Sequence, residues 1–412
     1  MKIFKKETVL DSALERIRYL FDEFPNIVIG MSGGKDSTVI FNLALQIAKE
    51  KNRLPLNVLW IDQEGEWIGT VDYVKKIMTM PEVKPYWLQM PMVITNNANS
   101  YERYSYCWEE SEKENWIHQK HPISIKENRY GTDRFKEIFD NVLRVEFGGV
   151  KTCLLGGVRA EESPSRLLTL TSIAKYKGIT WGKTFSKKLD HYAFYPIYDW
   201  SYTDVWKYIN DNNIEYNRIY DEFYRHGTII KEMRISNLHH ETSIHTLKIV
   251  QKIEPKLWDR LQKRIPGASS IKQLKNNSFI CPKKLPFMFK NWEEYAIHLA
   301  DNIIQEDKYK ALLMGKIKTM RKFYDSDLIY DSFWRVIINT ILSSDWDFTK
   351  LGNWLNNAGV FTYRRIKSNP DGSNNKKHVW MRSLLQPANT KYLTLDQKHK
   401  LVEYFSDERN KK

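Results

Sequence analysis

The first half of the chain alternates between helical and strand-like spacing of its apolar residues. An apolar helical face extends over residues 8–22, and the β-branched run Ile27–Ile29 predicts a short buried strand. Further strands are expected at Leu56–Ile61, Lys84–Gln89 and Lys151–Leu155, and further helices at Thr38–Lys49, Thr70–Met80, Phe135–Phe147, Thr203–Ile209 and Tyr216–Tyr224. This order predicts an α/β fold, in which a parallel twisted sheet with right-handed crossovers has helices on both faces.

Two regions depart from this alternation. Residues 92–134 have no regular period and are expected to form an insertion at the mouth of the sheet, outside the core. An insertion of this length is typical of a substrate lid or a binding loop. From Ile244 onward the pattern is mostly helical, so we expect two domains, at 1–240 and 241–412. The helices expected in the second domain are Ile244–Leu261 with a break at Pro255, Trp292–Ile317, Tyr330–Ser343 and Asp347–Ala358.

A basic hairpin is expected near the end of the chain, at about residues 360–382. Val360–Ile366 and His378–Arg382 can pair as strands across a turn rich in Asn, Pro, Asp and Gly. The basic residues there are Arg364, Arg365, Lys367, Lys376, Lys377 and Arg382. A winged nucleic-acid-binding element and a charged hairpin exposed to solvent both fit this pattern.

The turn Ser32–Ser37, which reads S-G-G-K-D-S, is the strongest candidate for a binding site. It joins the first predicted strand to a helix, where free amides and the helix dipole favour an anion. Gly33 and Gly34 let the backbone approach a phosphate closely, and Lys35 adds a positive charge. It is not the common P-loop, which requires Ser or Thr after the lysine, where this chain has Asp36.

Two more strand ends carry candidate ligand residues, because parallel sheets bind ligands at the carboxyl ends of their strands. Asp62 follows the second strand and is a candidate magnesium ligand, whereas Glu64 and Glu66 are weaker candidates. The third strand end opens onto a glycine pair and two arginines, which suit an anion. Its candidate binding residues are Gly156, Gly157, Arg159, Glu162, Ser163 and Arg166.

Two serines are expected to cap the helices that follow them. Ser163 precedes Pro164, which suits the first position of a helix, and Ser201 precedes the helix expected from Thr203. The capping role of Ser163 is compatible with a binding site at the same place.

These motifs resemble a known family. The S-G-G-K-D-S turn resembles the PP-loop of the adenine-nucleotide alpha-hydrolase-like superfamily, which includes ATP pyrophosphatases and enzymes of tRNA and DNA sulfur transfer. G-V-R-A-E-E-S-P-S-R at 157–166 and Y-P-I-Y-D-W at 195–200 resemble its phosphoadenylyl-sulfate (PAPS) reductase branch. The resemblance covers about residues 25–225. It implies that adenine is held by Gly30, Met31, Trp60 and Ile61. Phosphate would be held by Ser32, Gly33, Gly34, Lys35, Asp36 and Ser37, and the anionic end of the substrate by Arg159 and Arg166.

The cysteines depart from that family. True reductases attack with a cysteine in a C-terminal E-C-G-L-H segment, and this sequence has no such segment. It also has no C-x-x-C pair, which argues against an iron–sulfur cluster. Cys107 is a candidate reactive thiol, whereas Cys153 and Cys281 are expected to be structural. Reduction of activated sulfate is therefore not expected.

A second segment resembles a subgroup of the family. M-R-I-S-N-L-H-H-E-T at 233–242 and R-I-P-G at 264–267 are similar to reductase-like proteins of bacteria and prophages. Some of these are described as co-activators encoded beside a ParB-like protein, which implies a ParB-like partner. His239, His240, Glu241 and His245 also form a local group in which zinc coordination is conceivable, although polar residues at a domain junction or in the wall of the active site are favoured.

Charge and hydropathy add information about partners. The net charge of +14 and the 14 Trp and 23 Tyr favour contact with DNA or RNA, through phosphates and stacked bases. No apolar run approaches membrane-spanning length and no signal-peptide core follows the basic start, so a cytoplasmic protein without membrane contact is expected.

The leading hypothesis is an enzyme that binds ATP or a related adenine nucleotide with Mg²⁺. It would cleave the α–β bond by adenylylating an acceptor in a nucleic-acid-linked process, with Lys35, Asp36, Asp62 and Arg159 as its catalytic residues. One alternative is a nucleotide-sensing co-activator or DNA-associated regulator that acts with the ParB-like partner. Another is a sulfur-transfer enzyme acting on DNA or tRNA.

Overall fold

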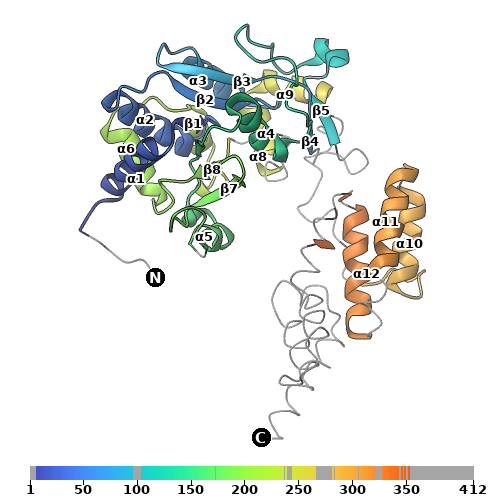
Figure 1. Cartoon of the computed structure of the whole chain (residues 1–412). Coiled ribbons are helices and arrows are strands. Elements are labelled where there is room, and N and C mark those ends of the chain that lie inside the picture. The colour runs from blue at the N-terminus through green and yellow to red at the C-terminus, as the bar shows by residue number, and fades with distance from the viewer. Residues whose placement is uncertain are drawn as a thin grey trace, which may run out of the picture. The chain divides into compact units, whose positions relative to one another are not determined.

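The computed structural model shows a chain that divides into two compact units (Figure 1). It describes residues 6–95, 104–171, 173–235, 237–238, 244–265, 281–282, 284–304, 306–320, 327–342, 345–346, 348 and 351–352. One unit consists of Met1–Ala98 and Tyr104–Lys272, and the other of Asn99–Arg103 and Gln273–Lys412. The boundary expected near residue 240 thus falls inside the first unit.

The first unit is built on a six-stranded sheet in the order β3-β2-β1-β6-β8-β7. The strands are β1 (Asn26–Gly30), β2 (Leu56–Ile61), β3 (Val83–Leu88), β6 (Thr152–Leu155), β7 (Gly182–Ser186) and β8 (His191–Phe194). All neighbouring pairs are parallel except β7 and β8, which are antiparallel. The sheet confirms the predicted α/β class, although β7 and β8 were not expected from the sequence.

Alternate side chains of the strands enter separate cores on the two faces of the sheet. Ile27 and Ile29 of β1 join the core formed with α1 (Val9–Glu23), α2 (Lys35–Glu50), α3 (Ile68–Met78) and α6 (Tyr202–Asp211). Val28 points to the other face, which is covered by α4 (Phe135–Phe147). This alternation follows from the period of two in a strand, and it confirms helices on both faces (Figure 1).

Part of the region expected to be irregular forms an ordered cover on the second face. Strand β4 (Met92–Thr95) pairs antiparallel with β5 (Tyr104–Cys107), and the 3₁₀ helix η1 (Glu110–Asn115) follows. Trp108 and Tyr130 are fully buried in the core beneath it. The expectation of a region outside the core is therefore wrong for these residues, whose aromatic side chains supply much of the packing.

The remaining helices of the first unit are short. They are η2 (Ala160–Glu162), α5 (Pro164–Thr171), α7 (Ile219–Arg225), η3 (Ile230–Glu232), α8 (Ile244–Ile253) and α9 (Pro255–Arg264). The break expected at Pro255 is present, because α8 ends before Glu254 and Pro255 begins α9. The predicted N-caps are also confirmed, since Ser163 Oγ accepts from the amide of Arg166 and Ser201 Oγ from that of Asp204.

The second unit has its own apolar core. Its described helices are α10 (Trp292–Ile303), α11 (Asp307–Met320) and α12 (Asp327–Leu342). The single helix expected at Trp292–Ile317 is in fact two, α10 and α11, with Ile304 outside both of them. Most of the helix expected at Asp347–Ala358 and all of the hairpin at 360–382 lie outside the described residues. Within the described parts of both units, no helix combines the length and apolar character needed to cross a bilayer.

Candidate functional site

The turn between β1 and α2 leads directly into the start of a helix. Helix α2 begins at Lys35, three residues earlier than predicted, and its N-cap Gly34 makes no side-chain cap. Gly33 has a φ of +72°, and a Cβ at this position would lie 2.7 Å from Thr70 Cγ2. Glycine is thus required here both by the backbone conformation and by close packing against α3. The first amides of α2 have no partner within the helix, which suits anion binding.

The two serines of this turn brace it from within. Ser32 and Ser37 join their hydroxyls at 3.0 Å, and Ser37 Oγ also donates to the carbonyl of Gly34 at 2.9 Å. The amide of Ser32 donates to Ser37 Oγ at 3.3 Å. These bonds hold the turn in shape without a ligand.

Lys35 is enclosed by aromatic rings and a carboxylate. It is 9% exposed, and its Nζ lies 2.7 Å from Asp36 Oδ2 and 5.7 Å from the ring centroids of both Tyr202 and Tyr220. The Tyr220 hydroxyl also accepts from the Lys35 amide at 3.3 Å. Burial, followed by the Asp36 charge, raises the pKa of Tyr220 well above its ordinary value. Tyr202 and Tyr220 were not predicted as site residues, since aromatic residues at helical spacing look like core.

Arg159 meets the same turn from the end of β6. Only 4% exposed, it places Nε 2.6 Å from Asp36 Oδ1 and donates from Nη1 to Glu161 at 3.1 Å and to the Trp200 carbonyl at 3.3 Å. Gly157 lies against α2, where a Cβ would be 2.7 Å from the Asp36 carbonyl carbon. The structure therefore brings Lys35, Asp36, Gly157 and Arg159 together, with protein partners around the guanidinium.

Arg166 and Arg234 add positive charge beside this group. Arg166, on α5, pairs with Glu162 and remains 46% exposed at its side chain. Burial and the nearby charge of Arg234 lower the pKa of Arg166, and Asp36 acts in the opposite direction. Arg234 precedes Ile235, whose Cδ1 lies 3.8 Å from the Cβ position of Gly34. Arg234 was not a predicted site residue, because it follows the motifs that carried the prediction.

The residues expected to hold adenine lie on β1 and β2, next to the turn. The Met31 amide donates to the Leu59 carbonyl at 2.8 Å, which extends the pairing of the two strands. Trp60 is buried in the core that contains α2 and α3, where the centre of its ring lies 4.9 Å from that of Trp87. Ile61 faces the core on the side of α4. An adenine contact at Gly30 and the Trp60–Ile61 strand end stays a prediction.

Asp62 belongs to a buried hydrogen-bond network. It is 0% exposed, and its Oδ2 accepts from Trp87 Nε1 at 3.0 Å and Gln89 Nε2 at 2.8 Å, while Oδ1 accepts from the Glu64 amide at 3.0 Å. His118 Nε2 lies 3.3 Å from Oδ1. These donors occupy both carboxylate oxygens, so the arrangement does not fit the open oxygen set that Mg²⁺ prefers. The magnesium role of Asp62 stays a prediction that this geometry does not favour.

Three ionisable groups near Asp62 complete the network. Glu64 accepts from Arg264 Nε at 2.8 Å, and both side chains are buried. Burial, and then the charge of Asp62, raises the pKa of Glu66 to about 8. Burial lowers the pKa of His118, but the Asp62 and Glu64 carboxylates raise it by more, so the net shift is upward. Glu66 is therefore mostly protonated at neutral pH.

The cysteines and histidines offer no further chemistry among the described residues. All three cysteines are buried and free, and burial raises the pKa of Cys107, Cys153 and Cys281. Buried thiols are not reactive thiolates, which argues against the candidate role of Cys107. Where side chains are described, no three His, Cys, Asp or Glu residues are grouped to hold a metal. His239, His240 and Glu241 lie outside this part, as does the side chain of His245.

Comparison with known proteins identifies relatives of the chain. The chain is 26% identical over 309 residues to the uncharacterized protein YbdN of Escherichia coli, which covers 72% of this chain and 75% of that protein. It is 25% identical over 224 residues to the adenosine 5'-phosphosulfate reductase of Lysinibacillus sphaericus, covering 54% of this chain and 79% of the relative.

Solved structures give a weaker likeness. The Candida glabrata FMN adenylyltransferase in complex with FAD and pyrophosphate is 14% identical, with a TM-score of 0.34, and covers 53% of this chain and 64% of its own. The PAPS reductase of Candida auris is 18% identical, with a TM-score of 0.29, and covers 54% and 93%.

A family model matches the part of the chain that holds the site. This model describes the phosphoadenosine phosphosulfate reductase domain, and it aligns with residues 26–228. The matched range begins at β1 and includes the Ser32–Ser37 turn, the arginine motif at residues 157–166 and α7. Residues 26–228, just under half of the chain, therefore match the phosphoadenosine phosphosulfate reductase domain family.

Proposed function

We propose that the first unit binds ATP or a related adenine nucleotide, with its phosphates on the Ser32–Ser37 turn. The observation that carries this proposal is the start of α2, where Lys35 stands and the first amides have no partner within the helix, inside the range that matches this family. Anions bind helix N-termini of this kind because the amides and the dipole both favour negative charge. Adenine would then lie at the ends of β1 and β2, next to Met31 and Trp60.

We further propose that the nucleotide is cleaved between its α and β phosphates. An acceptor oxygen or nitrogen would attack the α-phosphorus and form a new bond to it, while the α–β bridging bond breaks and pyrophosphate leaves with the electron pair. Lys35 and the α2 amides would stabilise the charge that develops on the phosphate oxygens. Arg166 and Arg234 suit the far anionic end better than Arg159, whose guanidinium is already bonded to Asp36 and Glu161. No step is assigned to a metal ion.

Sulfate reduction is not part of this proposal. It would need a cysteine nucleophile in an E-C-G-L-H segment, which the sequence does not contain. The three cysteines present are buried, with raised pKa values. We therefore expect no covalent protein intermediate.

Pyrophosphate release from ATP by the purified full chain tests the reaction, with DNA, tRNA or neither present. Turnover should depend on Lys35, so Lys35→Ala should lose most of it, whereas Lys49→Ala, at the other end of α2, should leave it unchanged. Tight ATP binding without pyrophosphate release under every condition would refute cleavage and leave a binding protein.

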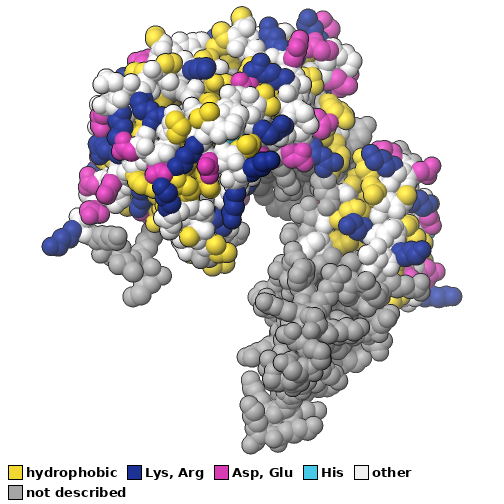
Figure 2. Space-filling model, in the orientation of Figure 1, with side chains coloured by type: hydrophobic (Ala, Val, Ile, Leu, Met, Phe, Trp, Pro, Cys, Tyr) yellow, Lys and Arg dark blue, Asp and Glu magenta, His cyan; other side chains and the backbone are white. Residues whose placement is uncertain are grey.

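A nucleotide-sensing regulator that acts on nucleic acid, with a ParB-like partner, is the second candidate. The net charge of +14 favours it, and Figure 2 shows Lys and Arg side chains spread among acidic and apolar ones on the visible face of the first unit. If nucleic acid is bound through phosphates, affinity should fall steeply with salt. Replacing Arg364, Arg365, Lys376 and Lys377 together should reduce that dependence; binding that salt does not affect would refute this candidate.

Sulfur transfer to DNA or tRNA would require a sulfur donor as well as ATP. The pyrophosphate-release assay, repeated with such a donor, distinguishes it.

A further inference from the structure

Residues that follow the matched range 26–228 contact the loop after β2. This loop, residues 62–67, ends where α3 begins at Ile68. Leu238 donates its amide to the Gly65 carbonyl at 2.8 Å, and Asn237 Nδ2 donates to the Gln63 carbonyl at 3.2 Å. Arg264, at the end of α9, forms the buried pair with Glu64. Asn237, Leu238 and Arg264 thus hold the loop at three points.

Glu254 contacts the start of α3, the helix that packs against the Ser32–Ser37 turn (the phosphate turn). Its Oε2 accepts from the Ile68 amide and its Oε1 from the Gly69 amide, both at 2.9 Å. Helix α3 has Trp67 as its N-cap, which provides no side-chain cap. A carboxylate that accepts from the first amides of a helix performs that capping role and also interacts favourably with the helix dipole. Glu254 therefore caps α3 from the junction between α8 and α9.

The first turn of α3 is in direct contact with the Ser32–Ser37 turn. Asn217 Nδ2 donates to Thr70 Oγ1 at 2.7 Å and to the Gly33 carbonyl at 3.3 Å. Thr70 Cγ2 also packs against Gly33, since a Cβ added at Gly33 would lie 2.7 Å from it. Thr70 is the next residue after Gly69, whose amide donates to Glu254. Only one turn of helix and one asparagine therefore separate the Glu254 carboxylate from the phosphate turn.

We propose that Glu254 is a positioning residue of the phosphate site, acting through the first turn of α3, Thr70 and Asn217 on the backbone at Gly33. Its effect on affinity rests on the proposed nucleotide binding, but its effect on the turn does not. When the cap is lost, the first turn of α3 can fray, and the contact that sets the Gly33 carbonyl is weakened. The amides of α2 would then be less well ordered before an anion arrives.

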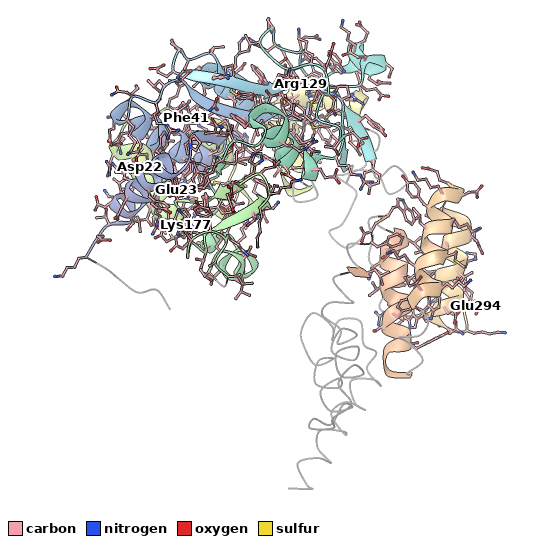
Figure 3. All side chains as sticks on the ribbon, in the orientation of Figure 1. Asp22, Glu23, Phe41, Arg129, Lys177 and Glu294 are labelled. Carbon is pink, nitrogen blue, oxygen red and sulfur yellow. The ribbon has the colours of Figure 1, made fainter. Side chains whose placement is uncertain are left out.

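Two variants of Glu254 and one control test this role in the full chain. Glu254→Ala removes both acceptor oxygens, and Glu254→Gln keeps one acceptor without the charge. Glu23→Gln is the control, because Glu23 is also a partly buried carboxylate, on α1, that binds Lys151 and Lys177 rather than the loop (Figure 3). All three should lose some thermal stability, which by itself would not separate a positioning role from a structural one.

Hydrogen exchange of the amides from Gly33 to Ser37, without nucleotide, provides the first readout. We expect faster exchange in Glu254→Ala, partial rescue in Glu254→Gln and wild-type rates in Glu23→Gln. Equal rates in Glu254→Ala and the wild type would overturn the proposal. Because this measurement needs no ligand, it remains decisive even if the protein does not bind ATP.

ATP affinity, measured by calorimetry, provides the second readout. We expect the dissociation constant of Glu254→Ala to rise about tenfold, with Glu254→Gln in between and Glu23→Gln unchanged. Combining Glu254→Ala with Asn217→Ala should weaken binding by less than the product of the two separate effects, since both act through α3. A simple product would count against the shared route, whereas no ATP binding by the wild type would refute the proposed function alone.

Discussion

Arg159 Nε lies 2.6 Å from Asp36 Oδ1, and this contact joins the arginine motif after β6 to the first turn of α2. Asp36 is also held by Lys35 Nζ at 2.7 Å, so one carboxylate connects two cations from different strand ends. The two motifs that suggested separate halves of a binding site are thus one hydrogen-bonded structure. Asp36 keeps Lys35 and Arg159 close together, where their like charges would otherwise repel each other.

Arg159→Ala should therefore reduce stability as well as activity. The change removes one of the two cations that pair with Asp36 and leaves Lys35 as the other, so we expect a loss of about 1.5–3 kcal/mol in the free energy of unfolding, measured with urea. Arg159→Ala combined with Asp36→Asn should lose less than the sum of the single changes. If Arg159→Ala keeps wild-type stability but loses nucleotide affinity, Arg159 is instead a ligand contact.

Gly157→Ala should destabilise the same junction by a different mechanism. Its new Cβ would lie 2.7–2.9 Å from backbone atoms of Asp36 and Ser37, which cannot rotate away as a side chain can. We expect a loss of about 1–3 kcal/mol, the usual cost of overpacking, in urea unfolding. Gly149→Ala is the matched control, because nothing lies within 4 Å of a Cβ there. Equal stability of the two variants would show that α2 shifts at no cost.

The sequence predicted the parts of the fold that depend on local periodicity. The Ile27–Ile29 run, the Phe135–Phe147 helix and the Ser201 cap are confirmed, because apolar spacing and capping chemistry are local properties. The antiparallel edge strand β7 was missed, since its burial is partial and, within the described part of the chain, it pairs with β8 alone. The cover at 92–134 was missed because its buried residues, among them Trp108, Trp116 and Tyr130, follow no regular period.

The site was predictable only as far as its motifs reach. Lys35, Asp36 and Arg159 come from recognisable segments, and the structure brings them together. Their protein partners could not be read from the sequence, because Tyr220 and Glu254 are distant in the chain and resemble ordinary helix residues. Asp62 looked like a ligand because it follows a strand, but its donors come from the next strand and the cover.

The three cysteines should react slowly with thiol reagents in the folded protein. Each is buried, and burial raises its pKa, so both access and thiolate content are low. Titration with an aromatic disulfide should give far less than one rapid equivalent in buffer and three in denaturant, the number in the sequence. One rapid equivalent that disappears in Cys107→Ser would identify Cys107 as a reactive thiol after all.

Glu66 should make the stability of the first unit fall as pH rises. Its pKa is raised from 4.5 to about 8 by burial and by Asp62, so the folded state keeps a proton that the unfolded state releases in this range. Its stabilising contribution is complete below pH 4.5 and is lost as pH rises through about 8. The largest slope for one proton is about 1.4 kcal/mol per pH unit. His118, whose pKa is also raised, contributes in the same direction, so one variant must isolate Glu66.

Glu66→Gln provides that isolation, because the amide stays neutral at every pH and keeps a similar shape. The difference in unfolding free energy between wild type and variant, measured with urea from pH 5 to 8, should change steadily in favour of the variant, by about 2–4 kcal/mol in total. Glu110→Gln serves as the control, since Glu110 is an exposed carboxylate on η1, and it should leave the wild-type slope intact. A pH-independent difference for Glu66→Gln would mean that Glu66 is already ionised in the folded protein.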